Sequence, residues 1–159
     1  MPGCSFVYVM YVRTTIEKLW DALTKPEYTR AYWFGVTQES EWTPGASWRT
    51  VFPDGSLGDS GEVVEIEKPK RLLLKWRHEF RPELRAEGYS RCLLELEPAD
   101  EAVRLIVRHE MDKPDSKFIT AISDGWPQIL SSLKSLIETG EPLDRIAARP
   151  PMLVRSPKA

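Results

Sequence analysis

The sequence predicts an α+β fold in which one long helix packs against a curved antiparallel sheet. Residues 5–111 contain six or seven short segments rich in β-branched and aromatic side chains, separated by turn residues. Nearer the C-terminus, an apolar stripe with helical spacing predicts the long helix; it consists of Trp126, Ile129, Leu133 and Leu136. Such a helix is only marginally stable alone in water, so its stripe must pack on the sheet. A long helix that crosses a curved sheet tends to enclose a cavity.

The chain starts with a strand and two short helices. Residues 5–13 carry β-branched and aromatic side chains with little charge, which predicts a strand. Thr14 and Glu17 have the spacing of a capping box, so we expect the first helix to begin at Thr14. Pro26 suits the first position of a second helix, which we expect to end near Ala31. Together the two helices form a bent arm.

Turn residues divide the middle of the chain into strands. Pro-Gly, Pro-Asp-Gly and Lys-Pro-Lys motifs separate successive segments and favour hairpins. Because a hairpin joins antiparallel neighbours, we expect all of these strands in one sheet. The predicted strands are residues 38–42, 47–52, 58–66, 71–79, 89–97 and 102–111.

The long helix contains a proline. The ring of Pro127 clashes with the carbonyl four residues earlier in a regular helix. We therefore predict a break or kink near residues 124–126, with a short helical piece before it and the main helix ending at about Thr139. The segment that follows is rich in proline and has no periodicity. This organisation predicts one domain over residues 1–140 and a flexible tail over residues 141–159.

The charge balance does not favour nucleic-acid binding. The 22 Lys and Arg residues and 24 Asp and Glu residues give a net charge of −2, without the basic surplus that attracts nucleic acids. The sequence contains no apolar run long enough to span a membrane, and its first residues lack the cationic start of a secretory leader. We therefore expect a cytoplasmic protein in which the thiols of Cys4 and Cys92 stay reduced.

The order of the predicted elements resembles the helix-grip fold of START-like (SRPBCC) proteins. Four segments within residues 5–139 are similar to the family named for the activator of Hsp ninety ATPase. They are Thr14 to Thr24 with its Trp-x-Ala-Leu-Thr core, Gly61 to Ile66 with Arg71-Leu72 and Lys75-Trp76, His109-Glu110, and Gly125-Trp126 with Leu133.

This resemblance implies an internal pocket for a small hydrophobic molecule, which includes lipid-like ligands. The eukaryotic co-chaperone of the family carries a separate N-terminal chaperone-binding domain with a motif rich in Asn and Trp, and this chain has neither. Chaperone activation is therefore not favoured, although interaction with a chaperone or regulator stays an alternative.

Hairpin turns fix the register of the strands, which predicts the side chains that line the pocket. Counting from the turn centres places five side chains in one row across the sheet: Trp48, Glu62, Trp76, Ser90 and His109. The same count places Val107 opposite Cys92 in the neighbouring apolar column. We hypothesise that the row forms the polar end of a pocket, which Trp126 and Ile129 close at its apolar end. The alternative is that Glu62 and His109 lie in water at the open end of the sheet.

The chemistry of these residues favours binding over catalysis. The two histidines, His78 and His109, lie too far apart in the predicted register for a shared metal site, and no Cys/His cluster or nucleophile motif is present. We therefore expect a binding protein without metal or cofactor, whose partner is a small hydrophobic or aromatic molecule. One alternative is a cyclase- or hydrolase-like enzyme that uses Glu62 and His109. Another is an interaction module with an exposed apolar patch.

Overall fold

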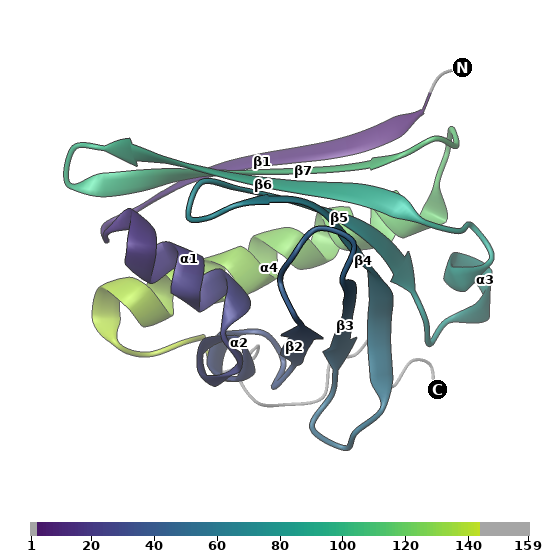
Figure 1. Ribbon diagram of the computed structural model, residues 1–159, viewed down its shortest axis with the longest axis horizontal. Helices are drawn as coiled ribbons and strands as arrows, with labels where there is room; N and C mark the ends of the chain where they lie inside the picture. Colours follow the sequence, from purple (N-terminus) through teal and green to yellow (C-terminus); the bar gives the residue numbers. More distant parts are fainter. Residues whose placement is uncertain (1–2, 144–159) are drawn as a thin grey trace.

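A seven-stranded antiparallel sheet and one long helix make up most of the fold, as the sequence predicts (Figure 1). The computed structural model describes residues 3–143. The elements are β1 (Cys4–Val12), α1 (Ile16–Thr24), α2 (Pro26–Tyr32), β2 (Thr37–Ser40), β3 (Ser47–Val51), β4 (Leu57–Glu67), β5 (Arg71–His78), α3 (Pro82–Arg85), β6 (Ser90–Ala99), β7 (Ala102–Met111) and α4 (Lys117–Thr139).

The sheet curves around α4. Its strand order is β1-β7-β6-β5-β4-β3-β2, so each strand neighbours the next in sequence except that β1 pairs with β7. In Figure 1, α4 lies on the concave side of the sheet, and α1 and α2 lie beside the C-terminal half of α4. The core fills the space between these layers with apolar side chains from every strand except β2 and from all four helices. The predicted tail comprises residues 141–159, of which residues 144–159 lie outside the described residues.

The N-cap of the first helix lies one residue later than predicted. Thr15 is the N-cap of α1, and its hydroxyl accepts a hydrogen bond from the Lys18 backbone N–H at 3.2 Å. The predicted capping box of Thr14 and Glu17 is therefore wrong. Only Thr14 has a glutamate three residues later, but Thr15 caps the helix through the backbone N–H of Lys18, which any residue except proline can supply.

Of the predicted break or kink in the long helix, the break is wrong, because α4 runs as one helix from Lys117 to Thr139 with Pro127 inside it. Pro127 removes one backbone hydrogen bond and costs about 3 kcal/mol in a helix interior. Trp126, Leu130 and Leu133 are almost fully buried against the sheet, and each contributes about 1.5–3 kcal/mol by its burial. Tertiary packing therefore outweighs the local cost.

The register of β4 is correct at one end and wrong at the other. Ile66 pairs with Leu72 as the turn at Pro69 requires, but an irregularity between Val63 and Glu65 adds one residue to β4. Beyond this bulge Gly61, rather than Glu62, lies opposite Trp76. A slip of one residue reverses every side chain beyond it, so Glu62 faces away from the predicted row.

The last hairpin shifts by two residues. Ala99 pairs with Ala102, so the turn centres one residue later than predicted. His109 therefore lies opposite Cys92 instead of Ser90, and Val107 lies opposite Leu94. Because side chains alternate with a period of two, these residues stay on the predicted inner face.

Gly61 brings two tryptophans together across β4. It pairs with Trp48 on β3 and with Trp76 on β5. No side chain stands between these indoles, and their ring centroids lie 4.5 Å apart. A Cβ atom on Gly61 would lie 1.8 Å from the carbonyl oxygen of Lys75, closer than any real contact. The backbones of β4 and β5 therefore depend on glycine at this position.

We predict that Gly61→Ala and Gly125→Ala change stability in opposite directions. Gly61→Ala forces β4 and β5 apart and should lower the free energy of unfolding by more than about 2 kcal/mol. Gly125 lies within α4 with open space around its Cα, so Gly125→Ala should raise it by about 0.5–1 kcal/mol. Urea unfolding followed by circular dichroism measures both. Equal stability of Gly61→Ala and the wild type would contradict this account.

Candidate functional site

A line of three hydrogen bonds connects α4 to three strands on the inner face of the sheet. The indole Nε1–H of Trp126 donates to His109 Nδ1 at 3.2 Å. The other ring nitrogen of His109, Nε2, lies 2.8 Å from the Ser90 hydroxyl, and that hydroxyl donates to the carbonyl of Trp76 at 2.9 Å. All four residues are buried. The line therefore joins α4 to β7, β6 and β5 in turn.

The donors in this line fix the tautomer of His109. An indole nitrogen can only donate, so Nδ1 of His109 must accept and the ring proton lies on Nε2. Nε2–H then donates to Ser90 Oγ, whose own proton is directed to the carbonyl of Trp76. Burial lowers the pKa of His109 to about 3, which keeps the ring neutral at physiological pH. A protonated ring would present Nδ1–H to the indole N–H, donor against donor.

Four tryptophans surround the centre of this line. Trp76 lies in the middle, with its ring centroid 4.5 Å from Trp48, 5.8 Å from Trp126 and 6.2 Å from Trp33. Trp33 also lies 5.8 Å from Trp126. The cluster therefore joins β3, β5, α4 and the connection that follows α2. These rings occupy the space where the sequence predicts a ligand pocket.

Most of the predicted site residues gather on the inner face. Trp48, Trp76, Ser90, Cys92, Val107, His109, Trp126 and Ile129 are all buried between the sheet and α4. Burial raises the pKa of the Cys92 thiol, and the charge of Asp59 adds to this effect. Cys92 is therefore a protonated core residue at neutral pH.

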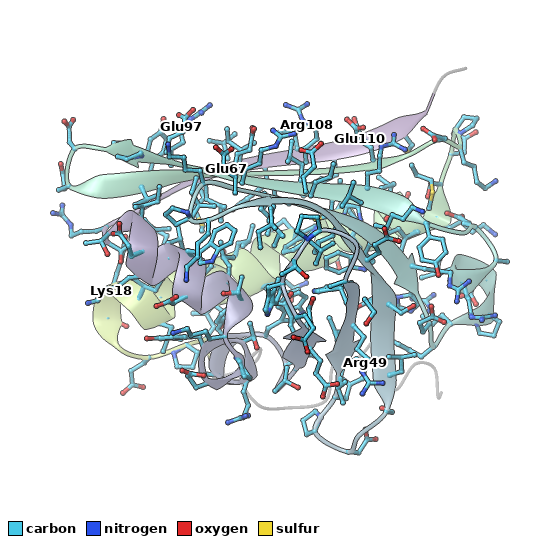
Figure 2. The ribbon with its side chains drawn as sticks, in the orientation of Figure 1. Lys18, Arg49, Glu67, Glu97, Arg108 and Glu110 are labelled. Carbon is cyan, nitrogen blue, oxygen red and sulfur yellow. The ribbon has the colours of Figure 1, made fainter. Side chains whose placement is uncertain are left out.

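Glu62 does not join this group. It pairs with Ser47 and Lys75, which point away from Trp48 and Trp76. The predicted row that places Glu62 and His109 on one face is therefore wrong, because the bulge in β4 puts their side chains on opposite faces. This outer face is charged: Glu67, Glu97, Arg108 and Glu110 project from it, away from α4 (Figure 2).

A second polar row, absent from the predicted register, lies beside the tryptophans. Thr50 pairs with Asp59, and Asp59 pairs with His78 on the next strand. The Thr50 hydroxyl donates to Asp59 Oδ2 at 2.9 Å, and Asp59 Oδ1 lies 3.5 Å from His78 Nδ1. His78 is only 6% exposed. The predicted register lacked the bulge in β4, so it placed Asp59 and His78 on opposite faces.

Two buried polar atoms on this face have no hydrogen-bond partner within residues 3–143. They are the indole Nε1 of Trp76 and Nε2 of His78, two residues apart on the same side of β5. An indole N–H is a donor, whereas Nε2 of a neutral histidine is an acceptor when Nδ1 carries the proton. The face therefore offers one donor and one acceptor in an aromatic environment.

A separate hollow lies between the helices. It measures about 490 Å³, within the size range of small-molecule sites, and lies between α1, α2 and the last turns of α4. Its lining residues are Arg13, Thr14, Thr15, Lys18, Ala22, Glu27, Tyr28, Ala31, Leu136 and Ile137. The site residues predicted from the sequence do not line this hollow, so the two locations can be tested separately.

The described residues set limits on other kinds of site. Between residues 3 and 143, no group of three or more His, Cys, Asp and Glu side chains could hold a metal ion. None of the helices in this part of the chain has the length and apolar character needed to cross a bilayer.

The curved sheet around a long C-terminal helix is the helix-grip architecture of START-like proteins. The family described as "Activator of Hsp90 ATPase homolog 1-like protein" matches residues 13–138 of this chain. The chain therefore belongs to this family. A search of curated proteins returns no match.

Solved structures share the fold. Protein MLL2253 from Mesorhizobium loti is 23% identical, with a TM-score of 0.71 over 85% of this chain and 97% of its own. DynU16, a protein from the dynemicin biosynthetic locus, is 25% identical with a TM-score of 0.71; the match covers 89% of this chain and 49% of DynU16. The Aha1 dimer from Colwellia psychrerythraea is 16% identical, with a TM-score of 0.67 over 86% of this chain and 98% of its own.

We predict that acid weakens the fold through His109. The pKa of His109 in the folded protein is about 3, below its ordinary value of 6.5. The unfolded chain therefore takes up this proton first, and stability falls as the pH decreases from about 6.5 to about 3. His109→Gln should remove this part of the pH dependence. Urea midpoints measured across this range test the prediction, and parallel curves for the two proteins would contradict it.

Glu79 provides the control for this experiment. Burial alone would raise the pKa of Glu79, but hydrogen bonds from Arg77, Ser60 and Arg85 outweigh it and hold the pKa at about 2. Its stabilising effect is complete above about 4.5 and is lost as the pH falls towards 2. In the plot of urea midpoint against pH, Glu79→Gln should therefore reduce the loss of stability only below about pH 4.5.

Proposed function

We propose that the protein binds a small apolar or aromatic molecule between the inner face of the sheet and α4. The observation that carries this proposal is the pair of unpartnered polar atoms on β5, Trp76 Nε1 and His78 Nε2. A buried polar atom without a partner costs about 1–3 kcal/mol, and functional sites are a common place to find one. A ligand that hydrogen-bonds to either atom would recover this free energy.

The surroundings of these atoms define the rest of the ligand. Trp76 contacts Trp33, Trp48 and Trp126, and His78 contacts Phe80 at a ring-centroid distance of 4.1 Å. Aromatic rings favour flat apolar molecules, which stack on them or meet their edges. The preferred ligand is therefore largely aromatic with one or two polar atoms.

Trp33 is the part of the cluster best placed to admit a ligand. It follows α2 directly, whereas the other three tryptophans lie on strands or on α4. The next residue, Phe34, has a φ of 51°, a conformation that non-glycine residues seldom adopt. A change in this connection would move Trp33 without breaking the sheet.

The structural neighbours are consistent with small-molecule binding. DynU16 belongs to a biosynthetic locus, and its fold overlaps most of this chain. We therefore propose that this protein acts in small-molecule metabolism.

A ligand panel tests the proposed function. Naphthalene, 1-naphthol and dodecanoate are each added to the protein, with binding measured by calorimetry and by the shift in melting temperature. We predict that 1-naphthol binds and raises the melting temperature, because it combines an aromatic body with one hydroxyl. Trp76→Phe removes the Nε1–H and should weaken 1-naphthol binding about fivefold, the effect of a hydrogen bond worth about 1 kcal/mol.

Ala31→Leu is the matched control for position. Ala31 lines the hollow between the helices and not the tryptophan cluster, so its enlargement should leave 1-naphthol binding unchanged. If Ala31→Leu abolishes binding and Trp76→Phe does not, the ligand lies in that hollow. If none of the three compounds binds, the proposed function is wrong.

A further inference from the structure

We infer that His78 and Asp59 form a proton-accepting pair that takes the hydroxyl proton of a bound phenol. This inference rests on the proposed function, because it concerns a molecule in the same site. It goes further by naming the class of ligand, a hydroxylated aromatic molecule, and the chemical step that the site performs on it.

The carboxylate of Asp59 orients the imidazole. Asp59 Oδ1 lies 3.5 Å from His78 Nδ1, the nearer of the two ring nitrogens to a negative charge. This charge favours the proton on Nδ1, which leaves the lone pair of Nε2 free to accept. A carboxylate behind a histidine is the arrangement that general bases use, because it stabilises the imidazolium that forms when the ring accepts a proton.

Thr50 holds Asp59 in place. Its hydroxyl donates to Asp59 Oδ2 at 2.9 Å and accepts from the Asp59 backbone N–H at 2.8 Å. These two hydrogen bonds fix the side chain while Oδ1 stays directed at the histidine. Thr50 is therefore a positioning residue for the pair.

Apolar rings cover the other side of His78. Its ring centroid lies 4.1 Å from that of Phe80 and 6.1 Å from that of Phe118, the second residue of α4. Phe118 also contacts His109, at 5.2 Å, so it lies between the two histidines. The hydrogen bonds of Lys117 and Phe118 to Glu87 hold this end of α4 in position.

The titratable groups around His78 come from three elements. Asp59 faces it from β4, and neutral His109 faces it from β7 across Phe118. Glu83 on α3 is a more distant neighbour; its own backbone and Arg81 lower its pKa, and His78 adds a small effect. The nearest of these groups is the carboxylate of Asp59, 3.5 Å from His78 Nδ1.

A phenol fits this environment better than other apolar molecules. A hydrocarbon has no proton to give, and a carboxylate arrives already ionised and would be repelled by Asp59. A phenol enters neutral and then loses its proton: its O–H bond breaks, an N–H bond forms at His78 Nε2, and the electron pair stays on oxygen. The products are a phenolate and an imidazolium paired with Asp59, so no other reactant is needed.

The test compares 4-nitrophenol with 4-nitroanisole. The two have similar size, but the anisole carries a methyl group in place of the proton, and only the phenolate absorbs strongly in the visible range. For the wild type we expect both to bind, and the ratio of phenolate to phenol for bound 4-nitrophenol to exceed its free-solution value about tenfold, a shift of one pKa unit. Visible absorbance recorded against pH measures this ratio.

Three variants distinguish proton acceptance by the pair of His78 and Asp59 from binding of the ligand. His78→Phe keeps an aromatic ring beside Phe80 but cannot accept a proton, and Asp59→Asn keeps a group that Thr50 can contact but removes the charge. Both should lose the excess of phenolate, and the 4-nitroanisole affinity of each variant, measured beside it, shows separately whether ligand binding has changed. Thr50→Val leaves both members of the pair in place and should lower the excess in part, so the test holds if one of the other variants does not fold.

The outcomes distinguish the two proposals. If the wild type binds 4-nitroanisole but its phenolate ratio equals that of His78→Phe and Asp59→Asn, the proton-accepting pair is refuted and the binding function stands. If 4-nitroanisole and 4-nitrophenol both fail to bind, while 1-naphthol also fails, the proposed function is refuted with it.

Discussion

The hydrogen bonds from Trp126 through His109 and Ser90 to the backbone of Trp76 determine how the rest of the interior is arranged. They are buried polar contacts between α4 and the strands on which it packs, whereas the hydrogen bond from Lys134 of α4 to the carbonyl of Tyr11 on β1 is exposed. Apolar burial supplies most of the driving force but has no direction, so it does not set the position of a helix along a sheet. A buried polar network does set this position, because any shift of the helix leaves the members of the network without hydrogen-bond partners.

Once α4 is fixed, the inner face divides into two neighbouring rows. One row contains Trp48, Gly61, Trp76 and Ser90, and its indoles fill the space below the helix. The other contains Thr50, Asp59 and His78, and ends near the start of α4, where Phe118 covers it. The first row gives rigidity, whereas the second presents an acceptor that has no partner within the described residues.

The sequence predicted the seven strands and the long helix because turn motifs and hydrophobic periodicity are local signals. It also placed Trp76 opposite Ser90 correctly, since few irregularities separate them from the turn that joins their strands. It failed at Glu62, because a bulge inside β4 leaves no mark in the residue pattern. The same bulge hid the pairing of Asp59 with His78. The continuity of α4 through Pro127 depended on packing, which local propensity does not report.

The most direct test of this account is the nuclear magnetic resonance signal of each indole N–H, assigned by replacing one tryptophan at a time. The N–H of Trp48 donates to Gln38 and that of Trp126 to His109, whereas that of Trp76 has no partner among residues 3–143. On addition of 1-naphthol, the signal of Trp76 should move most, and by a saturable amount. If the signal of Trp76 stays in place while binding is saturated, the ligand does not occupy the site between the sheet and α4, and the central claim is wrong.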